Sequence, residues 1–219
     1  MAKVVIFGAG DIGRLARFYF TSDSKHTVAA FTVDRAFRQE DTFDGLPLVD
    51  FETVTETFSP AEYSMFIAVS YAKMNHVRAE KYAHAKAKGY ALVSYISSRC
   101  TWLTEHPPGD NCFVLEDNTV QPFVKIGNDV TLWSGNHIGH DAVIEDHCFI
   151  SSHVVISGRV RVGEYCFLGV NATIRNAITI APETLVGAGA IVMADTAPKS
   201  VYVPERTSVF PRTSDKIKI

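Results

Sequence analysis

Four of the eight histidines lie close together in the chain, at His137, His140, His147 and His153. Such a group could bind a metal ion, because imidazole is a common metal ligand. One member could instead act as a general base, and His140 has nearby acidic partners in Asp141 and Glu145. A third interpretation makes His140 a polar turn residue. The residues alone leave all three interpretations open.

A second group of residues with chemical potential is the loop Gly8-Ala9-Gly10-Asp11-Ile12-Gly13. It follows an apolar run and precedes a helical pattern, which is the context of a nucleotide-binding GxGxxG loop. Asp34 lies 21 residues beyond Gly13, where an acid that binds a ribose is expected. Amides at a helix N-terminus suit any diphosphate. A segment of about ninety residues is only half of a dinucleotide fold, which disfavours NAD.

The elements that position the loop alternate between strand and helix. Apolar runs and helical spacing predict strands at Lys3–Phe7, Val28–Val33, Ser64–Val69 and Ala91–Ile96, and helices at Asp11–Phe20 and Asn75–Lys88. The charged stretch Arg38–Pro47 is expected to be a loop with a turn at Asp44-Gly45. This alternation predicts a small, doubly wound α/β domain, Rossmann-like, over residues 1–98.

The elements around the histidines follow a different period. From Cys112 onwards, the third residue of each of fourteen consecutive hexads is aliphatic, beginning at Val114 and ending at Val192. A period of six fits neither a helix nor regular hairpins, and it is typical of hexapeptide β-helix repeats. Three hexads form one triangular coil, so residues 18 apart should stack about 4.8 Å from one another. Residues 99–219 are therefore predicted to form a parallel β-helix.

This period makes specific predictions for cysteine and histidine. Cys112, Cys148 and Cys166 share the first hexad position, so they should point inward as small apolar fillers, with Cys148 stacked on Cys166. A nucleophilic cysteine is the alternative. His147 and His153 are one hexad apart and should face different sides, so the four histidines are not expected to bind one metal ion.

Composition restricts the class of protein further. The 219 residues carry 21 Lys+Arg and 24 Asp+Glu, and this balance disfavours a nucleic-acid partner. No apolar run approaches the length of a transmembrane helix, and the N-terminus has no signal-peptide pattern. The four cysteines form no CxxC pair. These features predict a cytoplasmic enzyme without membrane insertion.

Together with the hexads and the glycine loop, three segments carry a family resemblance: LWSGNHIGHD at 132–141, GVNATI at 169–174 and GAGAIV at 187–192. The chain resembles the sialic-acid O-acetyltransferase-like sugar acyltransferases, whose best-known members N-acetylate nucleotide-linked 4-amino-4,6-dideoxy sugars. The resemblance implies a left-handed β-helix, a homotrimer, and acetyl-CoA bound between neighbouring helices. It also implies a place in O-antigen or other surface-polysaccharide synthesis, and no metal.

The resemblance also implies roles for individual residues. His140 aligns with the family's general base, with Asp141, or alternatively Glu145, orienting its ring. The small residues expected to line acetyl-CoA are Gly169, Val170, Gly187 and Ala188, and the Gly169 N–H is a candidate oxyanion donor. One position departs from the family, because Phe149 stands where relatives carry a CoA-contacting histidine.

The implied substrate site combines both halves of the chain. The nucleotide is expected to contact Gly10, Asp11 and Asp34, with Lys73 and Asn75 as further candidates. Near the base, Asn136 and His137 could contact the sugar, although Asn118 and Asn136, 18 apart, could instead be a stacked structural pair.

The alternative functions are O-acetylation of a sugar hydroxyl, transfer of another acyl group, and a non-catalytic nucleotide-binding assembly protein. The sequence leaves the nucleotide base (UDP, dTDP or GDP) and the position of the amine open.

Overall fold

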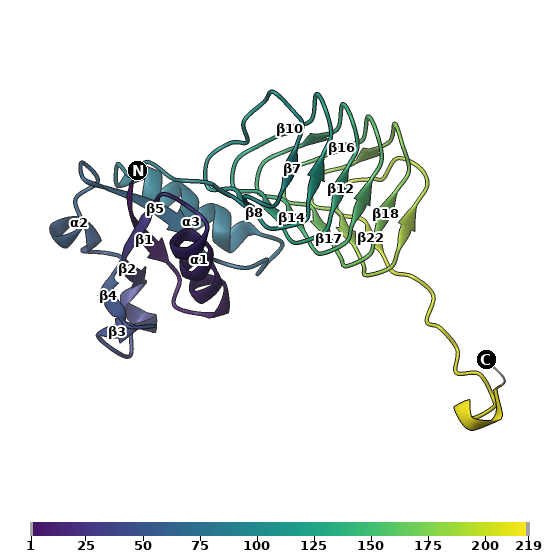
Figure 1. The fold of residues 1–219 in the computed structure, drawn as a ribbon, viewed down its shortest axis with the longest axis horizontal. Helices are drawn as coiled ribbons and strands as arrows, with labels where there is room; N and C mark the ends of the chain where they lie inside the picture. Colours follow the sequence, from purple (N-terminus) through teal and green to yellow (C-terminus); the bar gives the residue numbers. More distant parts are fainter. Residues whose placement is uncertain (1, 218–219) are drawn as a thin grey trace.

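The computed structural model describes residues 2–217 in two parts, an α/β unit and a prism of stacked coils, followed by an extended C-terminal segment (Figure 1). No helix in this described range is long and apolar enough to cross a membrane. The segment after β22, from residue 203, is exposed throughout and includes a short 3-10 helix, η2 (Ser214–Lys216).

The N-terminal sheet has the strand order β3-β4-β2-β1-β5, parallel except for the β3–β4 hairpin. Its strands are β1 (Lys3–Phe7), β2 (Thr27–Val33), β3 (Thr42–Phe43), β4 (Leu46–Asp50) and β5 (Tyr63–Ile67). Its helices are α1 (Asp11–Ser22), η1 (Arg35–Phe37), α2 (Val54–Thr57) and α3 (His76–Ala87). The predicted strands and helices of residues 3–88 are all present, whereas the stretch expected to be a loop forms the β3–β4 hairpin. Its turn at Asp44-Gly45 has positive φ at both residues, which suits a tight hairpin.

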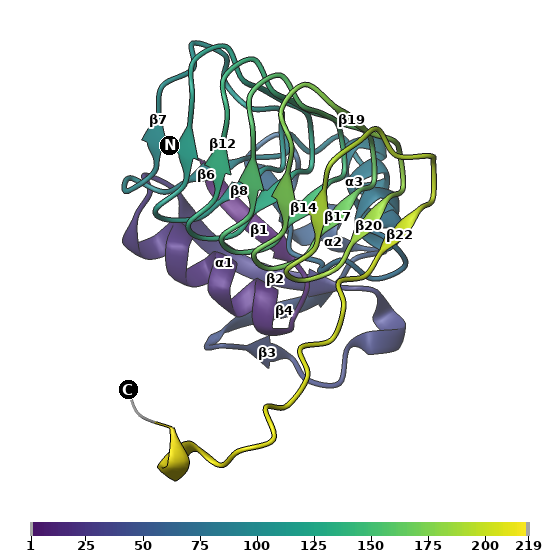
Figure 2. The same cartoon turned by 90° about the vertical axis from the view of Figure 1, so that its right-hand side faces the viewer.

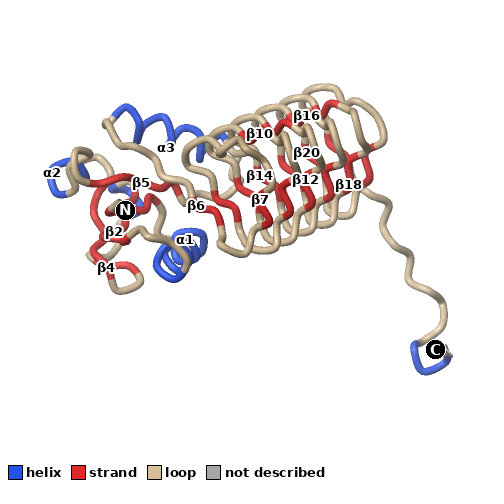
Figure 3. The backbone as a smooth tube through the Cα atoms, turned by 45° about the horizontal axis from the view of Figure 1, so that its top comes forward, coloured by secondary structure: helices blue, strands red, loops and turns tan. Residues whose placement is uncertain are grey.

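Alternate residues of each strand face opposite sides of this sheet, as the pleat requires. Val4 and Ile6 pack against Phe20 of α1, while Val5 and Phe7 face the core beneath α2 and α3. Figure 3 shows α1 and α3 on opposite sides of the strands. The cavity beside the glycine loop lies on the α1 side of this sheet, whereas Asp34 pairs with Lys81 on the α3 side.

The prism consists of two-residue parallel strands. They are β6 (Tyr95–Ile96), β7 (Thr101–Trp102), β8 (Phe113–Val114), β9 (Thr119–Val120), β10 (Lys125–Ile126), β11 (Thr131–Leu132), β12 (His137–Ile138), β13 (Val143–Ile144), β14 (Phe149–Ile150), β15 (Val155–Ile156), β16 (Arg161–Val162), β17 (Phe167–Leu168), β18 (Thr173–Ile174), β19 (Thr179–Ile180), β20 (Leu185–Val186), β21 (Ile191–Val192) and β22 (Val201–Tyr202). Three sheets form its faces, and from β8 to β21 each strand pairs with the strand 18 residues away. This stack of coils with a six-residue repeat fits a left-handed β-helix.

The core of the prism confirms the predicted inward positions. All fourteen aliphatic third positions are buried in one cluster, together with Cys112, Cys148 and Cys166 at first positions. Cys148 directly precedes Phe149, and Cys166 directly precedes Phe167. Because Phe149 and Phe167 are paired on neighbouring strands, the two cysteines stack as predicted. Burial raises the pKa of the Cys112 thiol to about 12, which suits an apolar filler rather than a nucleophile.

The segment Ala91–Ile96 differs from its prediction as one strand of the N-terminal sheet. Leu92 forms a single bridge to Met65 of that sheet, whereas Tyr95–Ile96 pairs with β8 and begins the stack of coils. Coil stacking therefore starts at Tyr95, three residues before the boundary that we place between residues 98 and 99. That boundary stays a proposal.

Three edges join the faces of the prism, and we name each after one of its residues. The His140 edge comprises residues 121–124, 139–142, 157–160 and 175–178. The Gly169 edge comprises 115–118, 133–136, 151–154, 169–172 and 187–190. The His147 edge comprises 127–130, 145–148, 163–166 and 181–184. α1 packs against the first coils beside the Gly169 edge (Figure 2). There the Tyr19 hydroxyl donates to Glu116.

Candidate active site

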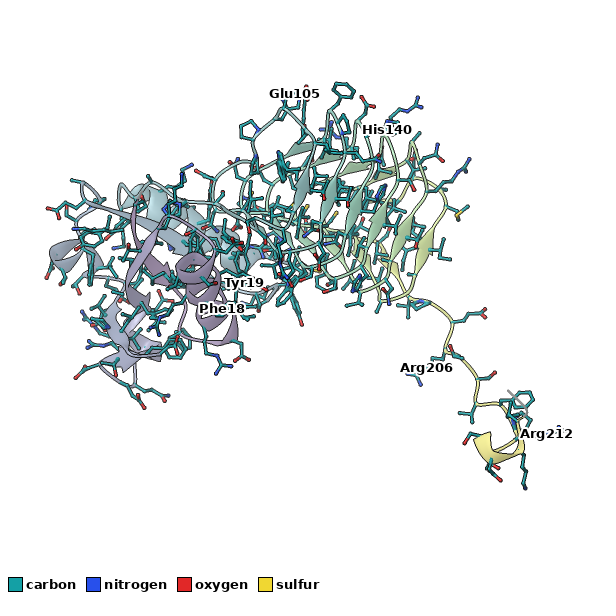
Figure 4. The ribbon with its side chains drawn as sticks, in the orientation of Figure 1. Phe18, Tyr19, Glu105, His140, Arg206 and Arg212 are labelled. Carbon is teal, nitrogen blue, oxygen red and sulfur yellow. The ribbon has the colours of Figure 1, made fainter. Side chains whose placement is uncertain are left out.

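His140 and Asp141 lie in the turn between β12 and β13. The imidazole Nδ1 is 2.7 Å from Asp141 Oδ2, and the two side chains are 50% and 51% exposed. When Nδ1 carries the hydrogen, it donates to the carboxylate and leaves the Nε2 lone pair free to accept a proton. Figure 4 shows His140 on the upper edge of the prism.

Neighbouring coils hold this turn in place. The His140 backbone N–H donates to Gln121 Oε1 (2.8 Å), and the His140 carbonyl accepts from the Arg159 N–H (2.8 Å). One coil above, Gly158 has no side chain, and a Cβ there would lie 2.6 Å from His140 Nε2. The imidazole therefore occupies space that this glycine leaves open.

The second acidic candidate has a different partner. Glu145 pairs with the guanidinium of Arg161. The ring of His140 thus contacts Asp141 in this structure.

The residues expected to line acetyl-CoA lie on a different edge of the same chain. Gly169 and Val170 stack beneath Gly187 and Ala188 on the Gly169 edge, because these pairs are 18 residues apart. The structure therefore groups these four residues with one another and separates them from His140.

The expectation for the Gly169 amide needs correction. Its N–H donates to the Val186 carbonyl at 2.7 Å, as part of the bonding between coils, so it is already used and is no oxyanion donor. A Cβ on Gly169 would lie 2.6 Å from the Ala188 nitrogen, so close coil packing requires glycine there. Val170, which is 44% exposed, lines a cavity of about 250 Å³ with Tyr71, Trp133 and Phe149. Phe149 is buried and packs on Phe167.

The glycine loop has the geometry that its motif predicts. Gly8 has φ +120°, and a Cβ there would lie 2.5 Å from the Ala68 carbonyl oxygen. A Cβ on Gly13 would collide with the Gly8 carbonyl, so this glycine lets α1 pack closely on β1. Gly10, the N-cap of α1, has open space where its Cβ would be, as an approaching phosphate requires. Asp11 follows on the surface and pairs with Arg14.

A cavity of about 350 Å³ adjoins the glycine loop on the α1 side of the sheet. Its lining includes Ala9, Phe37, Gln39, Glu40 and Phe43. Sequence reasoning missed these residues. The signal for them was the charged stretch before the Asp44-Gly45 turn, whose fold into η1 and a hairpin brings it over the loop.

Ion pairs hold the segment that carries Gln39 and Glu40. Asp50 of β4 accepts from Arg35 (2.8 Å) and Arg38 (3.2 Å), and Arg38 also contacts Asp41. The hydrogen bond from Arg35 holds the pKa of Asp50 below its usual value, so the carboxylate is charged near neutral pH.

Asp34 lies apart from this cavity. Its carboxylate pairs with Lys81 of α3 at 2.9 Å, and it lines a separate cavity with Phe51 and His84 on the α3 side of the sheet. We therefore replace the expected ribose contact of Asp34 with an ion pair that joins β2 to α3.

Asn75 also has a structural position rather than the expected substrate contact. It is fully buried, and its side-chain amide donates to the carbonyls of Tyr165 and Cys166, which docks α3 on the His147 edge. Beside it, Arg78 and Asp129 form a buried ion pair at 3.0 Å. Lys73 is exposed just before α3, with φ +50°.

Asn136 is only 1% exposed, so the expected contact with the sugar is wrong for this residue. Its backbone N–H donates to Asn118 Oδ1 at 3.2 Å, and its own Oδ1 accepts from the Val154 N–H at 2.8 Å. This ladder is the stacked pair that the 18-residue spacing suggested. His137 is half-buried on the face between the His140 and Gly169 edges.

The four histidines diverge, as the period predicts. His137 lies on a face, and His140, His147 and His153 lie on three different edges; His147 contacts Asp129 in the α3 junction. Residues 2–217 contain no group of three or more His, Cys, Asp or Glu side chains that could hold a metal ion.

Comparisons with known proteins agree with this geometry. Residues 123–158 match the family described as Bacterial transferase hexapeptide (six repeats). Curated relatives include UDP-N-acetylglucosamine O-acyltransferases that use acyl carrier protein. The one from Burkholderia lata is 25% identical over 33% of this chain, and the one from Stutzerimonas stutzeri is 29% identical over 39%. The matches span only 28% and 30% of those proteins.

Solved structures match almost the whole chain. The acetyltransferase domain of PglB from Neisseria gonorrhoeae has a TM-score of 0.80 at 21% identity, covering 94% of this chain and 100% of that domain. PerB from Caulobacter crescentus, solved with CoA and GDP-perosamine, has a TM-score of 0.80 at 24% identity, covering 92% and 93%. WeeI from Acinetobacter baumannii has a TM-score of 0.78 at 20% identity, covering 92% and 96%.

The chain therefore carries, at residues 123–158, hexapeptide repeats of the kind described for bacterial transferases. Over nearly its whole length it shares its fold with the acetyltransferase domain of PglB and with PerB, in agreement with the resemblance seen in the sequence.

Proposed function

We propose that this protein transfers the acetyl group of acetyl-CoA to the amine of a nucleotide-linked amino-dideoxy sugar. The observation that carries the proposal is the His140–Asp141 pair, held by coil stacking on an edge of the hexapeptide prism. The fold shared with PerB, which was solved with CoA and GDP-perosamine, supports this acceptor class.

In the proposed reaction, the sugar nitrogen attacks the thioester carbon. A carbon–nitrogen bond forms, the carbon–sulfur bond breaks, and His140 Nε2 takes the proton that the amine loses. Asp141 stabilises the resulting imidazolium through Nδ1, and the proton then passes to the CoA thiolate. The products are the N-acetyl sugar nucleotide and free CoA.

We infer that the N-terminal sheet acts as a Rossmann-like nucleotide domain. The open space at Gly10 and the amides at the start of α1 suit the diphosphate, and the cavity over Ala9 suits the rest of the nucleotide. Lys73 remains a candidate for a phosphate contact.

A homotrimer would complete the site. The His140 edge and the Gly169 edge flank one face, whose outward residues include the exposed, uncharged Val155 and Ile191. Packing of such faces around a three-fold axis would bring His140 of one copy to the Gly169 edge of the next, with acetyl-CoA between them.

The test is release of free thiol from acetyl-CoA with a panel of UDP-, dTDP- and GDP-linked amino sugars. His140→Ala should lower kcat by about 10²–10⁴-fold, the usual contribution of a general base, while acetyl-CoA binding measured by calorimetry changes little. Near-normal turnover of the variant would refute the assignment. Sugars with a hydroxyl in place of the amine separate N- from O-acetylation.

A further inference from the structure

The cavity beside the glycine loop contains an acidic side chain without a partner. Glu40 is exposed to this cavity, and its carboxylate forms no ion pair or side-chain hydrogen bond within residues 2–217. The surrounding charges are already matched, because Arg35 and Arg38 bind Asp50 and Asp41. The fold thus leaves the carboxylate of Glu40 unpaired at the lining of this cavity, on a segment that ion pairs hold in place.

Aromatic and amide groups accompany the carboxylate. Phe37 is 74% exposed at the cavity, so its ring can stack on a planar ligand. Gln39 also lines the cavity, and its side chain has no hydrogen-bond partner in the described residues. A flat ring with polar atoms on its edge fits such a lining.

The position of the cavity identifies which part of a nucleotide would reach it. Ala9 of the glycine loop forms part of its wall, and Gly10 follows directly at the start of α1. A diphosphate at the helix N-terminus therefore places its nucleoside at this cavity, outside the carboxyl ends of the parallel strands.

We propose that this cavity binds the base of the nucleotide and selects guanine, with Glu40 as the specificity-determining residue. Guanine has two adjacent donors, N1–H and the N2 amino group, which match the two oxygens of a carboxylate. The Gln39 amide can donate to O6. Uracil and thymine have a single ring N–H between two carbonyl oxygens, and these oxygens would face the negative charge of Glu40.

This inference rests on the proposed function, since it names the nucleotide of the acceptor. Calorimetry on the full chain with GDP, IDP, UDP and dTDP tests it, because IDP is GDP without the N2 amino group. Wild-type protein should bind GDP at least about tenfold more tightly than the other three, as expected for a hydrogen bond to a charged group.

Glu40→Gln should bring the GDP and IDP affinities to within about threefold of each other and should not weaken UDP binding. Glu62→Gln is the matched control, because Glu62 is also exposed and unpaired in the described chain but lies before β5, at the opposite ends of the strands. This control should keep the wild-type preference.

Two results would overturn the guanine inference and leave the proposed function standing. One is tightest binding of UDP or dTDP, and the other is a ratio of GDP affinity to IDP affinity that Glu40→Gln leaves unchanged. Failure of all four nucleotides to bind would instead overturn the proposed function as well.

Discussion

The imidazole of His140 keeps its place because residue 158, one coil above it, has no side chain. The three ring atoms nearest to a Cβ at that position would be 2.6–2.9 Å from it, closer than carbon and nitrogen atoms can approach. The backbone of Gly158 does not have the left-handed φ that would itself require glycine. Space for the ring is thus the reason for glycine at this position.

Gly158→Ala should therefore move the imidazole without straining the backbone. We expect kcat to fall about 10–100-fold, since a displacement of about 1 Å in a catalytic group can cost that much. The melting temperature should change little. Ser157→Ala, in the same turn, adds no atom and should retain full activity. A Gly158→Ala variant with wild-type kcat would show that the ring position is not critical.

Polar residues illustrate what residue type alone could not predict. Asn75 and Asn136 were expected to contact substrate at the surface, yet both are buried and bond to backbone groups. Asn75 donates to the Tyr165 carbonyl, which is 90 residues away in sequence, and Asn136 accepts from the Val154 N–H one coil further along. Burial of a polar side chain depends on these partners, and only the folded chain brings them together. The 18-residue spacing revealed the Asn118–Asn136 ladder, while nothing local pointed to Asn75.

Between elements, Asp23 connects the end of α1 to the start of the prism. Its Oδ2 accepts hydrogen bonds from Tyr95 of β6 (2.6 Å) and from the Ser98 N–H (2.8 Å). Hydrogen bonds from Ser98 and Tyr95 lower the pKa of Asp23 to about 2. The charged carboxylate therefore stabilises the folded junction.

This pKa gives a stability prediction with a definite sign. Because the folded-state pKa lies below the unfolded value of about 3.8, the contribution of Asp23 is present above the unfolded pKa and is lost as the pH falls through the folded pKa of about 2. Asp23→Asn should cost about 1 kcal/mol of unfolding free energy at pH 7, and the difference should shrink as the pH falls from about 4 to 2. Urea unfolding across this range measures it.

The control is Asp215→Asn in the exposed C-terminal segment, which should match wild type at every pH. A cost of Asp23→Asn that stays constant from pH 7 to pH 2 would contradict the assignment of the pKa to this junction.

At the element level, the predictable features were those with a strong local period. Helix α1 and strand β1 were predicted to within two residues, because apolar spacing and the glycine loop mark them. The β3–β4 hairpin was missed despite its Asp44-Gly45 turn, because β3 has only two residues. Tyr95–Ile96 was assigned to the wrong sheet, since a short apolar strand does not specify its neighbours.

Over the whole molecule, the glycine loop and the Gly169 edge lie together, whereas His140 occupies another edge. A site shared between copies predicts complementation. Gly10→Val is compatible with the extended backbone of Gly10 and meets no neighbouring atom at its Cβ, but should block the diphosphate. Each of Gly10→Val and His140→Ala should be inactive by itself.

Co-expression of the two variants in equal amounts should restore about one quarter of wild-type activity, because random assembly of the proposed homotrimer pairs an intact His140 with an intact loop at that frequency. The measurement is the specific activity of the purified mixed assemblies. As a control, co-expression of His140→Ala with a variant that carries both Gly10→Val and His140→Ala supplies no intact base and should give no activity. Absence of recovery in the first mixture would place the whole site within one chain.

The prism and its inward residues could be predicted from the six-residue period, because a repeat averages local signals over fourteen hexads. The docking of the α/β unit on that prism could not be predicted. It depends on single long-range contacts, such as Arg78 with Asp129, that have no period and leave no pattern in the sequence.

The pairing of each coil with residues 18 positions away also restricts how the length of this protein can change. Insertion or deletion of 18 residues between His140 and the C-terminus adds or removes one coil, and every later residue keeps its edge while moving about 4.8 Å along the axis. A change of six residues would rotate all later turns onto the next edge. Homologues that vary in the length of the prism should therefore differ by whole coils.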